Sequence, residues 1–457
     1  MNTGQNSAAS TTPTARGELS WQERDRIVLQ HPGLQASDFE RTVFVRGQGS
    51  TLWDSEGNEY LDGQSGAWLS HVGHGRKELA DAARRQVMAL EHFSTSGVFT
   101  NQPAITLAER LIAKAPDNIA RVRFASCGSE ADDEALKFAR LYHARRGKPE
   151  RTWVLSLEGC FHGRCYSGAA LQGFTAEQGL GPMLEHVRQV AAPVLRNRAP
   201  RVDSNVTDYC ISELRRTIDE LGAENIAAMF AEAIMTSPGM VELPSDYWPR
   251  VADVLAEHEI LLVFDEVVTA FGRCGEWFAA NLYGVQPDII TLAKGIASGY
   301  APLAAILMTE QLADVLAGAD GGGSYGGHAV ACAVANTNLD IIEREGLVAR
   351  SAQLGARMKA EFGELVDLPI VDYVSGQGLM MGVHLTADKA TGEPLPIAEG
   401  VIDAIFEKQY GILSMYYNGS VGFLPPLVLT DGEADRIVAA ARATLGRIHP
   451  DGSVDDR

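Results

Sequence analysis

Apolar residues in the middle of the chain occur in short, nearly continuous runs, and stretches with helical periodicity lie between them. The runs are TWVLSL (152–157), IAAMFA (226–231), ILLVFDEV (260–267) and PLAAILM (302–308). The stretches AITLAERLIAKA (104–115) and YWPRVADVLAEHE (247–259) have apolar residues three and four positions apart, as amphipathic helices do. Strands that are apolar throughout are buried on both faces, which is typical of a parallel sheet covered by helices. The pattern predicts an α/β fold with a mostly parallel central sheet.

The two ends of the chain have a different pattern of apolar and polar residues. Residues 44–62 alternate over short segments separated by Gly, Asn and Asp-Ser, which predicts a small antiparallel meander. Near the other end, GLMMGVHL (378–385) predicts a strand, and Thr430 with Glu433 predicts a capping box at the start of a last helix. We expect a large domain and a smaller α+β domain built from both chain ends. The predicted divisions are a disordered tail (1–18), an N-terminal segment of the small domain (19–75), the large domain (76–345) and the C-terminal small domain (346–457).

Composition narrows the class of protein. The chain has 457 residues, of which 46% are hydrophobic, and a formal net charge of -20, which argues against binding to nucleic acid or to an anionic membrane surface. No apolar run is long enough to span a bilayer, and the N-terminus lacks a hydrophobic signal core. The six cysteines form no CxxC pair and indicate reduced thiols. We therefore expect a cytoplasmic protein with no nucleic-acid partner, no membrane partner and no metal site.

Two of the apolar runs end in ionisable residues of opposite charge. ILLVFDEV ends in Asp265 and Glu266, and DIITLAK ends in Lys294. Alone, the first is typical of a strand that ends in a polar turn, and the second of a lysine that reaches the surface. Together, they place a lysine and an aspartate at the carboxyl edge of a parallel sheet, where open α/β sheets bind ligands. A lysine there can form a Schiff base with an aldehyde, and an aspartate can keep a pyridinium nitrogen protonated, which are the requirements of pyridoxal 5′-phosphate (PLP).

The segment FASCGSEADDEALKFAR (124–140) predicts a short strand followed by a helix. Gly128 permits close approach of the backbone, and Ser129 offers a hydroxyl and an N-cap, while the free N–H groups of a helix start bind phosphate well. Alone, the segment is typical of an ordinary capped helix. Because the acidic residues would repel a phosphate, we expect them to point away from it; they are Glu130, Asp132 and Asp133.

The segment GCFHGR (159–164) places an aromatic residue before a His-Gly turn. Phe161 could lie against a flat cofactor face, with His162 beside it, although alone the pair is typical of a core phenylalanine and a loop histidine. In order and spacing, these four segments resemble the class III, ω-aminotransferase-like family of fold-type I PLP enzymes. The resemblance extends from about residue 38 to residue 447 and is most specific over residues 230–305.

The resemblance implies a role for each matching residue. Lys294 would form the Schiff base, and Asp265 would pair with the pyridine nitrogen; these two are the expected catalytic residues. Phe161 and Val267 would cover the two faces of the cofactor ring. The other expected cofactor-binding residues are Gly128 and Ser129 at the phosphate, and His162 and Glu232, of which Glu232 would support Asp265 and the cofactor hydroxyl region.

The resemblance also implies a partner subunit and a substrate wall. Ser324 stands where the family usually has threonine, a residue that binds the phosphate of the neighbouring subunit. This implies a homodimer with active sites at the interface, because serine keeps the hydroxyl. Trp68 matches the aromatic wall of the substrate pocket in amine-handling members.

Three further positions depart from the family pattern. Ala233 replaces a proline, and Asp132 replaces an asparagine next to the expected phosphate site. Gly422 stands where many amino-acid-handling relatives have arginine, and no arginine occurs between Lys408 and Asp435. A buried α-carboxylate normally binds a bidentate arginine. Either another arginine serves this role, or one substrate lacks a carboxylate beside the reacting carbon.

The sequence thus predicts a PLP-dependent transaminase. It would move an amino group from an amine or amino-acid donor to a keto-acid or aldehyde acceptor by a ping-pong mechanism through Lys294. Trp68, Tyr416 and Tyr417 favour an amine or a bulky amino compound as donor. An aminomutase, decarboxylase or epimerase of the same family remains open, because fold does not fix function.

Two other classes are disfavoured. A nucleotide-dependent oxidoreductase rests only on GQGLMMG (376–382), whose last spacing is wrong for a dinucleotide-binding loop. A non-catalytic PLP-binding protein is disfavoured because Lys294, Asp265 and the phosphate-binding Gly-Ser occur together.

Overall fold

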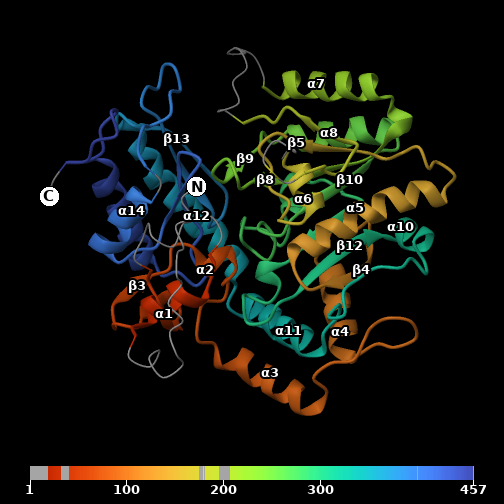
Figure 1. Ribbon diagram of the computed structural model, residues 1–457, viewed down its shortest axis with the longest axis horizontal. Coiled ribbons are helices and arrows are strands. Elements are labelled where there is room, and N and C mark those ends of the chain that lie inside the picture. The colour runs from red at the N-terminus through yellow and green to blue at the C-terminus, as the bar shows by residue number, and fades with distance from the viewer. Residues whose placement is uncertain are drawn as a thin grey trace, which may run out of the picture.

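The central feature of the structure is a seven-stranded sheet formed by the middle of the chain (Figure 1). The computed structural model describes residues 19–31, 41–173, 179, 181–194, 206–398 and 400–455. In spatial order, the strands are β4 (Ile119–Ala125), β12 (Ala304–Thr309), β11 (Ile289–Leu292), β10 (Leu261–Asp265), β7 (Ile226–Glu232), β5 (Trp153–Leu157) and β6 (Val187–Val190). Neighbouring strands from β11 to β6 are parallel, whereas β12 runs antiparallel to both β11 and β4. The prediction of a mostly parallel central sheet is confirmed.

The strands are apolar throughout because both faces of the sheet are buried. Phe230 and Val263 lie in a core cluster with apolar residues of α5 (Gly128–Arg145). Met229 and Leu262, which point to the other face, lie in a second cluster with residues of α8. Successive strand residues point to opposite faces, so a sheet with a hydrophobic core on each side needs apolar residues at every position.

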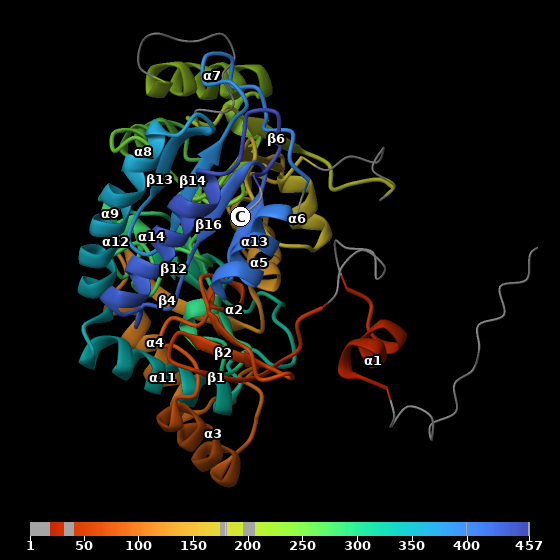
Figure 2. The same ribbon diagram turned by 90° about the vertical axis from the view of Figure 1, so that its left-hand side faces the viewer.

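The helices cover the sheet and connect its strands. Figure 2 shows α5 and α8 on opposite sides of the strands. Besides α5, the α-helices are α1 (Trp21–Val28), α2 (Ser65–Trp68), α3 (Lys77–Ala89), α4 (Gln102–Ile112), α6 (Tyr166–Leu171), α7 (Val206–Leu221), α8 (Tyr247–Glu257), α9 (Ala279–Tyr283), α10 (Glu310–Val315), α11 (Ala329–Arg344), α12 (Leu347–Gly363), α13 (Val401–Ile405) and α14 (Asp431–Leu445). The 3₁₀ helices are η4 (Ala223–Asn225), η5 (Lys294–Ile296) and η6 (Glu364–Asp367), and η7 (Phe406–Tyr410) is a π-helix.

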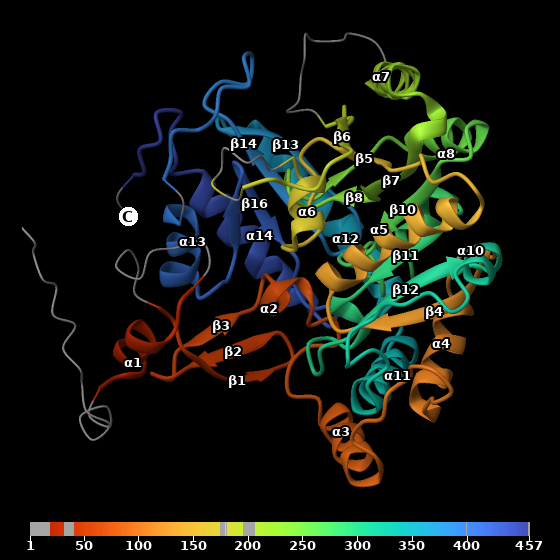
Figure 3. The ribbon, with the colours of Figure 1, turned by 45° about the vertical axis from the view of Figure 1, so that its right-hand side comes forward.

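The two ends of the chain form smaller antiparallel sheets that lie next to each other (Figures 1 and 3). The predicted N-terminal meander is confirmed as β1 (Phe44–Gln48), β2 (Thr51–Asp54) and β3 (Glu59–Leu61). The C-terminal sheet has the order β13 (Val371–Gly376), β14 (Met381–Leu385), β16 (Ser420–Phe423) and β15 (Met415–Tyr417). The Leu61 N–H donates to the Gly411 carbonyl oxygen over 2.7 Å, which links the two ends. A short pair, β8 (Ile234–Met235) and β9 (Val241–Glu242), completes the strands of the described residues.

The capping box of Thr430 and Glu433 starts α14, as predicted. The predicted divisions at residues 75/76 and 345/346 stay a prediction, and the tail predicted over residues 1–18 lies outside the described residues. No helix in the described part of the chain is long and apolar enough to cross a membrane.

Candidate active site

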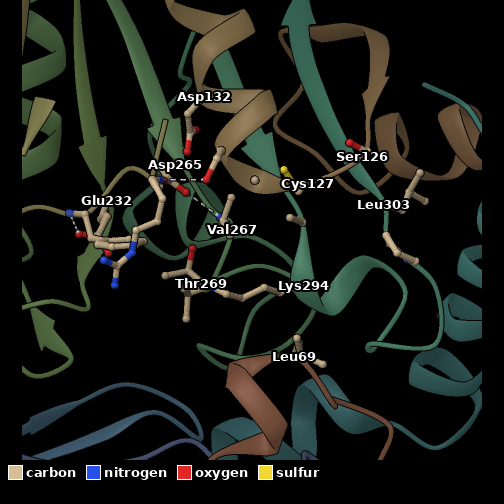
Figure 4. A pocket seen from close by; sticks show the side chains of 18 of the residues that line it. Leu69, Ser126, Cys127, Asp132, Glu232, Asp265, Val267, Thr269, Lys294 and Leu303 are labelled. Atoms are coloured by element: carbon tan, nitrogen blue, oxygen red, sulfur yellow. Dashed lines mark hydrogen bonds between the residues drawn. The ribbon is translucent and has the colours of Figure 1, made fainter. Parts of the chain in front are cut away.

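The candidate site lies where three neighbouring strands of the central sheet end. Glu232 on β7, Asp265 on β10 and Thr291 on β11 are in register across the sheet, so their side chains share a face. A cavity of about 430 Å³ opens at this edge, and Figure 4 shows side chains converging on it from several elements. Its lining includes Gly128, Ser129, Asp132, Phe161, Arg164, Glu232, Asp265, Val267 and Lys294.

Asp265 is held by two donors at the carboxyl end of β10. Its Oδ2 accepts a hydrogen bond from Nδ1 of His162 over 2.9 Å, and its Oδ1 accepts one from the Val267 N–H over 3.0 Å. The side chain is 6% exposed, so both contacts act in a largely dry environment. His162 lies behind Asp265, outside the cavity lining, and supports the carboxylate from the protein side.

Glu232 connects the strand edge to the Phe161 segment. One of its carboxylate oxygens accepts from the Phe161 N–H over 2.9 Å, and the other accepts from the Thr236 N–H over 3.0 Å and from the Thr236 hydroxyl. Burial raises the pKa of Glu232, and the charge of Asp265 adds to this effect. The contact fixes Phe161 at the cavity wall.

Lys294 extends into the cavity from a strained backbone position. It begins η5, separated from β11 by Ala293, and has φ of +44°, in the left-handed region that residues other than glycine rarely adopt. Its Nζ lies 5.2 Å from the ring centroid of Trp68. Burial lowers the pKa of the Lys294 amine, although Asp265, Glu232 and Asp132 act in the opposite direction. A lowered pKa increases the fraction of amine that can accept a proton or act as a nucleophile near neutral pH.

The start of α5 forms a cradle beside Phe161 and Val267. Gly128 is the first helical residue, and a Cβ added there would lie 3.1 Å from both γ carbons of Val267. The Ser129 hydroxyl accepts a hydrogen bond from the Arg164 N–H over 3.0 Å. The prediction that Ser129 is the N-cap is wrong: the N-cap is Cys127, and no side chain caps the helix. The first N–H groups of α5 thus lack a side-chain partner, as a phosphate site requires.

The prediction that all three acids of this helix point away is wrong for one of them. Glu130 turns back to accept from the Ser126 N–H over 2.8 Å, and Asp133 is half exposed beside Lys137. Asp132 instead lines the cavity with only 2% of its surface exposed. Asp132 lies three positions before Ala135 and shares its buried face of α5, which is known only from the structure.

Two further predicted residues lie outside the lining. Trp68 faces Lys294 but is not part of the lining, and Ser324 is exposed and lies in the segment before α11. Gly422 pairs with Met415 and Gly382 inside the C-terminal sheet and does not line the cavity. In the described part of the chain, Arg164 is the arginine that does line it; its guanidinium carbon lies 5.6 Å from the ring centroid of Phe161.

These residues fit the parts of PLP. The uncapped start of α5, with the small Gly128 and the Ser129 hydroxyl, suits a phosphate. The buried carboxylate of Asp265 suits a ring nitrogen, and Phe161 and Val267 supply apolar surface for a planar ring. Lys294 supplies an amine at the same cavity. The described residues therefore hold a donor set that matches the phosphate, the ring and the aldehyde.

Comparisons with known proteins agree with this chemistry. Residues 35–445 match the family model described as aminotransferase class-III. A diaminobutyrate–2-oxoglutarate transaminase of Halomonas elongata is 32% identical over 451 residues, covering 93% of this chain and 96% of the relative. The structure of a thermostable (S)-enantioselective omega-transaminase from Thermomicrobium roseum matches with a TM-score of 0.88 and 36% identity. The match covers 92% of this chain and 96% of the transaminase chain. An amine transaminase from an uncultivated Pseudomonas species, solved with PLP bound, has a TM-score of 0.86 and 34% identity, covering 91% of this chain and 98% of its own.

The fold and the cavity thus define a fold-type I enzyme that uses PLP as its cofactor. More particularly, the chain belongs to the class III aminotransferases, and it is an aminotransferase. The predicted family, fold class, cofactor and reaction type are confirmed. The oxidoreductase alternative is excluded, because residues 376–382 run from the end of β13 through a hairpin turn into the antiparallel β14, and no helix follows the loop.

Proposed function

We propose that this aminotransferase takes an amino group from an amine or bulky amino compound and delivers it to a keto acid. The observation that supports this proposal most is the composition of the cavity wall. Besides Lys294, Arg164 is the cationic side chain in the described lining, and much of the remaining surface is apolar, including Leu69, Ala301 and Leu303. A wall of this kind suits an apolar donor, while one arginine is sufficient to bind the carboxylate of a keto acid.

In the proposed mechanism, Lys294 moves the proton. When bound, PLP supplies an aldehyde that condenses with amines and a pyridinium ring that accepts the electrons released at the substrate carbon. Lys294 Nζ would take the proton from that carbon as a general base and, as a general acid, would deliver it to the former aldehyde carbon of the cofactor, C4′. Its burial lowers its pKa and so favours the neutral amine that begins this cycle. The Trp68 ring, 5.2 Å away, excludes water beside the amine.

Other residues would hold the ring and the phosphate of the cofactor. Asp265, fixed by His162 and by the Val267 N–H, would hold the ring nitrogen of the cofactor and keep it protonated. Glu232 fixes Phe161 through its backbone N–H, so that the aromatic ring remains at the cavity wall. The free N–H groups at the start of α5 and the Ser129 hydroxyl would bind the phosphate of the cofactor.

A panel of donors and acceptors tests the proposed substrates. The purified chain with PLP is mixed in turn with primary amines, diamines and α-amino acids, and the change in cofactor absorption is followed without acceptor. The enzyme that now carries the amino form of the cofactor is then mixed with pyruvate, 2-oxoglutarate or an aldehyde. We expect amines to react faster than α-amino acids, and keto acids to restore the starting spectrum. Faster reaction with α-amino acids than with every amine would overturn the proposed donor class.

Substitution of Arg164 by leucine is expected to weaken binding of the keto acid selectively. Loss of a charged hydrogen-bond partner should raise KM for the keto acid by roughly 10- to 100-fold. The rate of the half-reaction with an amine that has no carboxylate should change by less than about threefold, because Arg164 contacts no group on such a donor. Stopped-flow measurement of both half-reactions checks the separation.

The conservative variant Arg164→Lys serves as control for this prediction. It keeps the positive charge but loses the planar pair of donors, so its KM for the keto acid should lie between the KM of the wild type and that of Arg164→Leu. An equal loss in both half-reactions would show that Arg164 supports the fold of the site rather than the keto-acid carboxylate.

We also infer a homodimer and a cytoplasmic location. The end of α3 and the segment after it carry exposed apolar side chains, and so does the residue after Ser324; they are Val87, Met88, Phe93, Val98, Phe99 and Tyr325. Apolar surface of this extent favours a partner, and its proximity in sequence to Ser324 agrees with a shared active site. The six cysteines are unpaired, which agrees with a reducing compartment. Sedimentation equilibrium of the full chain is expected to give twice the chain mass, and the mass of a single chain would contradict the dimer.

A further inference from the structure

Asp132 is a buried acid whose surroundings differ from those of a surface carboxylate. It lies in the second turn of α5, on the face that covers the central sheet, and 2% of its surface is exposed. Its Oδ1 accepts a hydrogen bond from the Thr291 hydroxyl over 2.6 Å. Thr291 is the register partner of Asp265 on the neighbouring strand, so this bond brings Asp132 to the same point of the sheet as Asp265.

The side chain of Asp132 lies close to a second buried carboxylate, that of Asp265. One oxygen of Asp132, one oxygen of Asp265 and one ring nitrogen of His162 all lie within 4.8 Å of one another, and all three residues are buried. Figure 4 shows the two carboxylates side by side at the wall of the cavity. Two buried carboxylates at this separation cannot both ionise without a large loss of free energy. Burial raises the pKa of Asp132 well above its ordinary value, and Asp265 raises it further.

Two placements of a proton, on His162 or on Asp132, would reduce the repulsion between the two carboxylates. The ionisable groups that face Asp132 are Asp265 on β10, His162 before α6, Lys294 in η5 and Cys165. Burial alone would lower the pKa of His162, but Cys160 and Asp265 raise it overall, so one arrangement protonates His162 fully and leaves Asp132 ionised. The Nε2 of His162, however, is buried and has no hydrogen-bond partner among the described residues. A second proton on that ring would face the Cys160 sulfur, which is a weak acceptor as a thiol, whereas a proton on Asp132 has a carboxylate oxygen of Asp265 beside it.

We propose that Asp132 is a positioning residue that carries a proton and donates it to Asp265 in a hydrogen bond, so that the two acids share one negative charge. This inference rests on the proposed role of Asp265 toward the ring nitrogen. Each carboxylate oxygen can accept two hydrogen bonds, so Asp265 can accept one from Asp132 besides those from His162 and the Val267 N–H. The third donor holds Asp265 in its orientation and leaves its charge for the cofactor.

Three substitutions separate this role from a merely structural one. Asp132→Asn is isosteric; its carbonyl oxygen can accept from Thr291 and its amide can donate to Asp265, but it carries no titrating proton. Asp132→Leu removes both contacts. Asp133→Asn is the matched control, because it makes the same change one residue further along α5, at a half-exposed side chain beside Lys137.

The first readout is infrared absorption of the full-length enzyme loaded with PLP, at neutral pH. A protonated buried carboxyl has a C=O stretching band that a carboxylate lacks. We expect the spectrum of the wild type minus that of Asp132→Asn to show one such band, and the same subtraction for Asp133→Asn to show none. Absence of the band from the Asp132 difference would place the proton elsewhere and overturn the proposal.

The second readout is PLP affinity as a function of pH, followed by cofactor absorption. Near neutral pH, Asp132→Asn should bind PLP within about threefold of the wild type, and Asp132→Leu about tenfold more weakly, as expected for loss of one buried hydrogen bond. Toward alkaline pH, the wild type should lose affinity relative to Asp132→Asn, because Asp132 ionises and repels Asp265. Equal affinities of the leucine variant and the wild type at all pH values would contradict a positioning role.

These outcomes are independent of the proposed donor and acceptor. If the wild type shows the carboxyl band but prefers α-amino acids, the proposed function fails and the inference about Asp132 holds. If the wild type transfers amino groups from amines but the band is missing, the inference about Asp132 alone fails.

Discussion

Lys294→Ala is expected to lower the rate of amino transfer by at least about 10⁴-fold, because no other amine of the described cavity wall can move the proton at the substrate carbon. The variant should still bind PLP through Asp265 and the start of α5, with weaker retention because the covalent link is lost. Steady-state turnover with the best donor and acceptor measures the first effect. Cofactor release on dialysis, followed by absorption, measures the second.

The control for this variant is Lys77→Ala at the start of α3. The side chain of Lys77 is 85% exposed, so the same chemical change is made far from the cavity, and turnover should match the wild type. Turnover of Lys294→Ala above about one per cent of the wild-type value, with protein purified free of the wild type, would contradict the assignment of Lys294.

The lowered pKa of Lys294 also predicts how stability changes with pH. Burial lowers this pKa in the folded chain, so between that value and the ordinary 10.5 the unfolded chain binds more protons than the folded chain. The free energy of unfolding of the cofactor-free protein should therefore gain from Lys294 as pH rises through this window. Lys294→Met should lack this gain, which thermal melts across alkaline pH can measure. Parallel curves for the two proteins would show that Lys294 is not desolvated.

The elements that position the site could be predicted because they depend on local patterns. A strand buried on both faces must be apolar at every position, and β10 shows this pattern up to Asp265. The same reasoning placed Lys294 just after β11, where the structure has it. The carboxyl edge of a parallel sheet then brings both residues to one cavity. No long-range information was needed beyond the rule that parallel strands end together.

The rotation of a helix about its own axis could not be predicted in the same way. Asp132 was expected to face away from the site because an isolated acid beside a phosphate is unfavourable. Its actual direction depends on Thr291, which is 159 residues further along the chain and supplies its hydrogen bond. Arg164 was missed for a similar reason, because only the assembled cavity shows that its segment lines the wall. Such residues become visible only when tertiary contacts are known.

Asp265→Asn is expected to retain PLP but to lower the rate of proton transfer by roughly 10³-fold. The asparagine oxygen can still accept from the Val267 N–H, and its amide group can donate to Nδ1 of His162 once that ring takes its other tautomer, so the fold of the site should survive. It removes the negative charge that favours a protonated ring nitrogen, and a neutral ring accepts the electrons of the substrate carbon poorly. Stopped-flow measurement of the amine half-reaction at saturating PLP separates this effect from cofactor loss. Asp253→Asn, at an exposed position of α8, is the matched control.

A cofactor with a permanent ring charge tests the cause of this loss. PLP methylated at the ring nitrogen is cationic without a proton, so it does not need the carboxylate of Asp265 for its charge. If the role of Asp265 is electrostatic, this analogue should restore Asp265→Ala, which leaves room for the methyl group, by at least about tenfold relative to unmodified PLP. It should not improve the wild type, in which the methyl group meets the side chain of Asp265. Equal rates of the alanine variant with both cofactors would mean that Asp265 acts through the geometry of the site rather than through its charge.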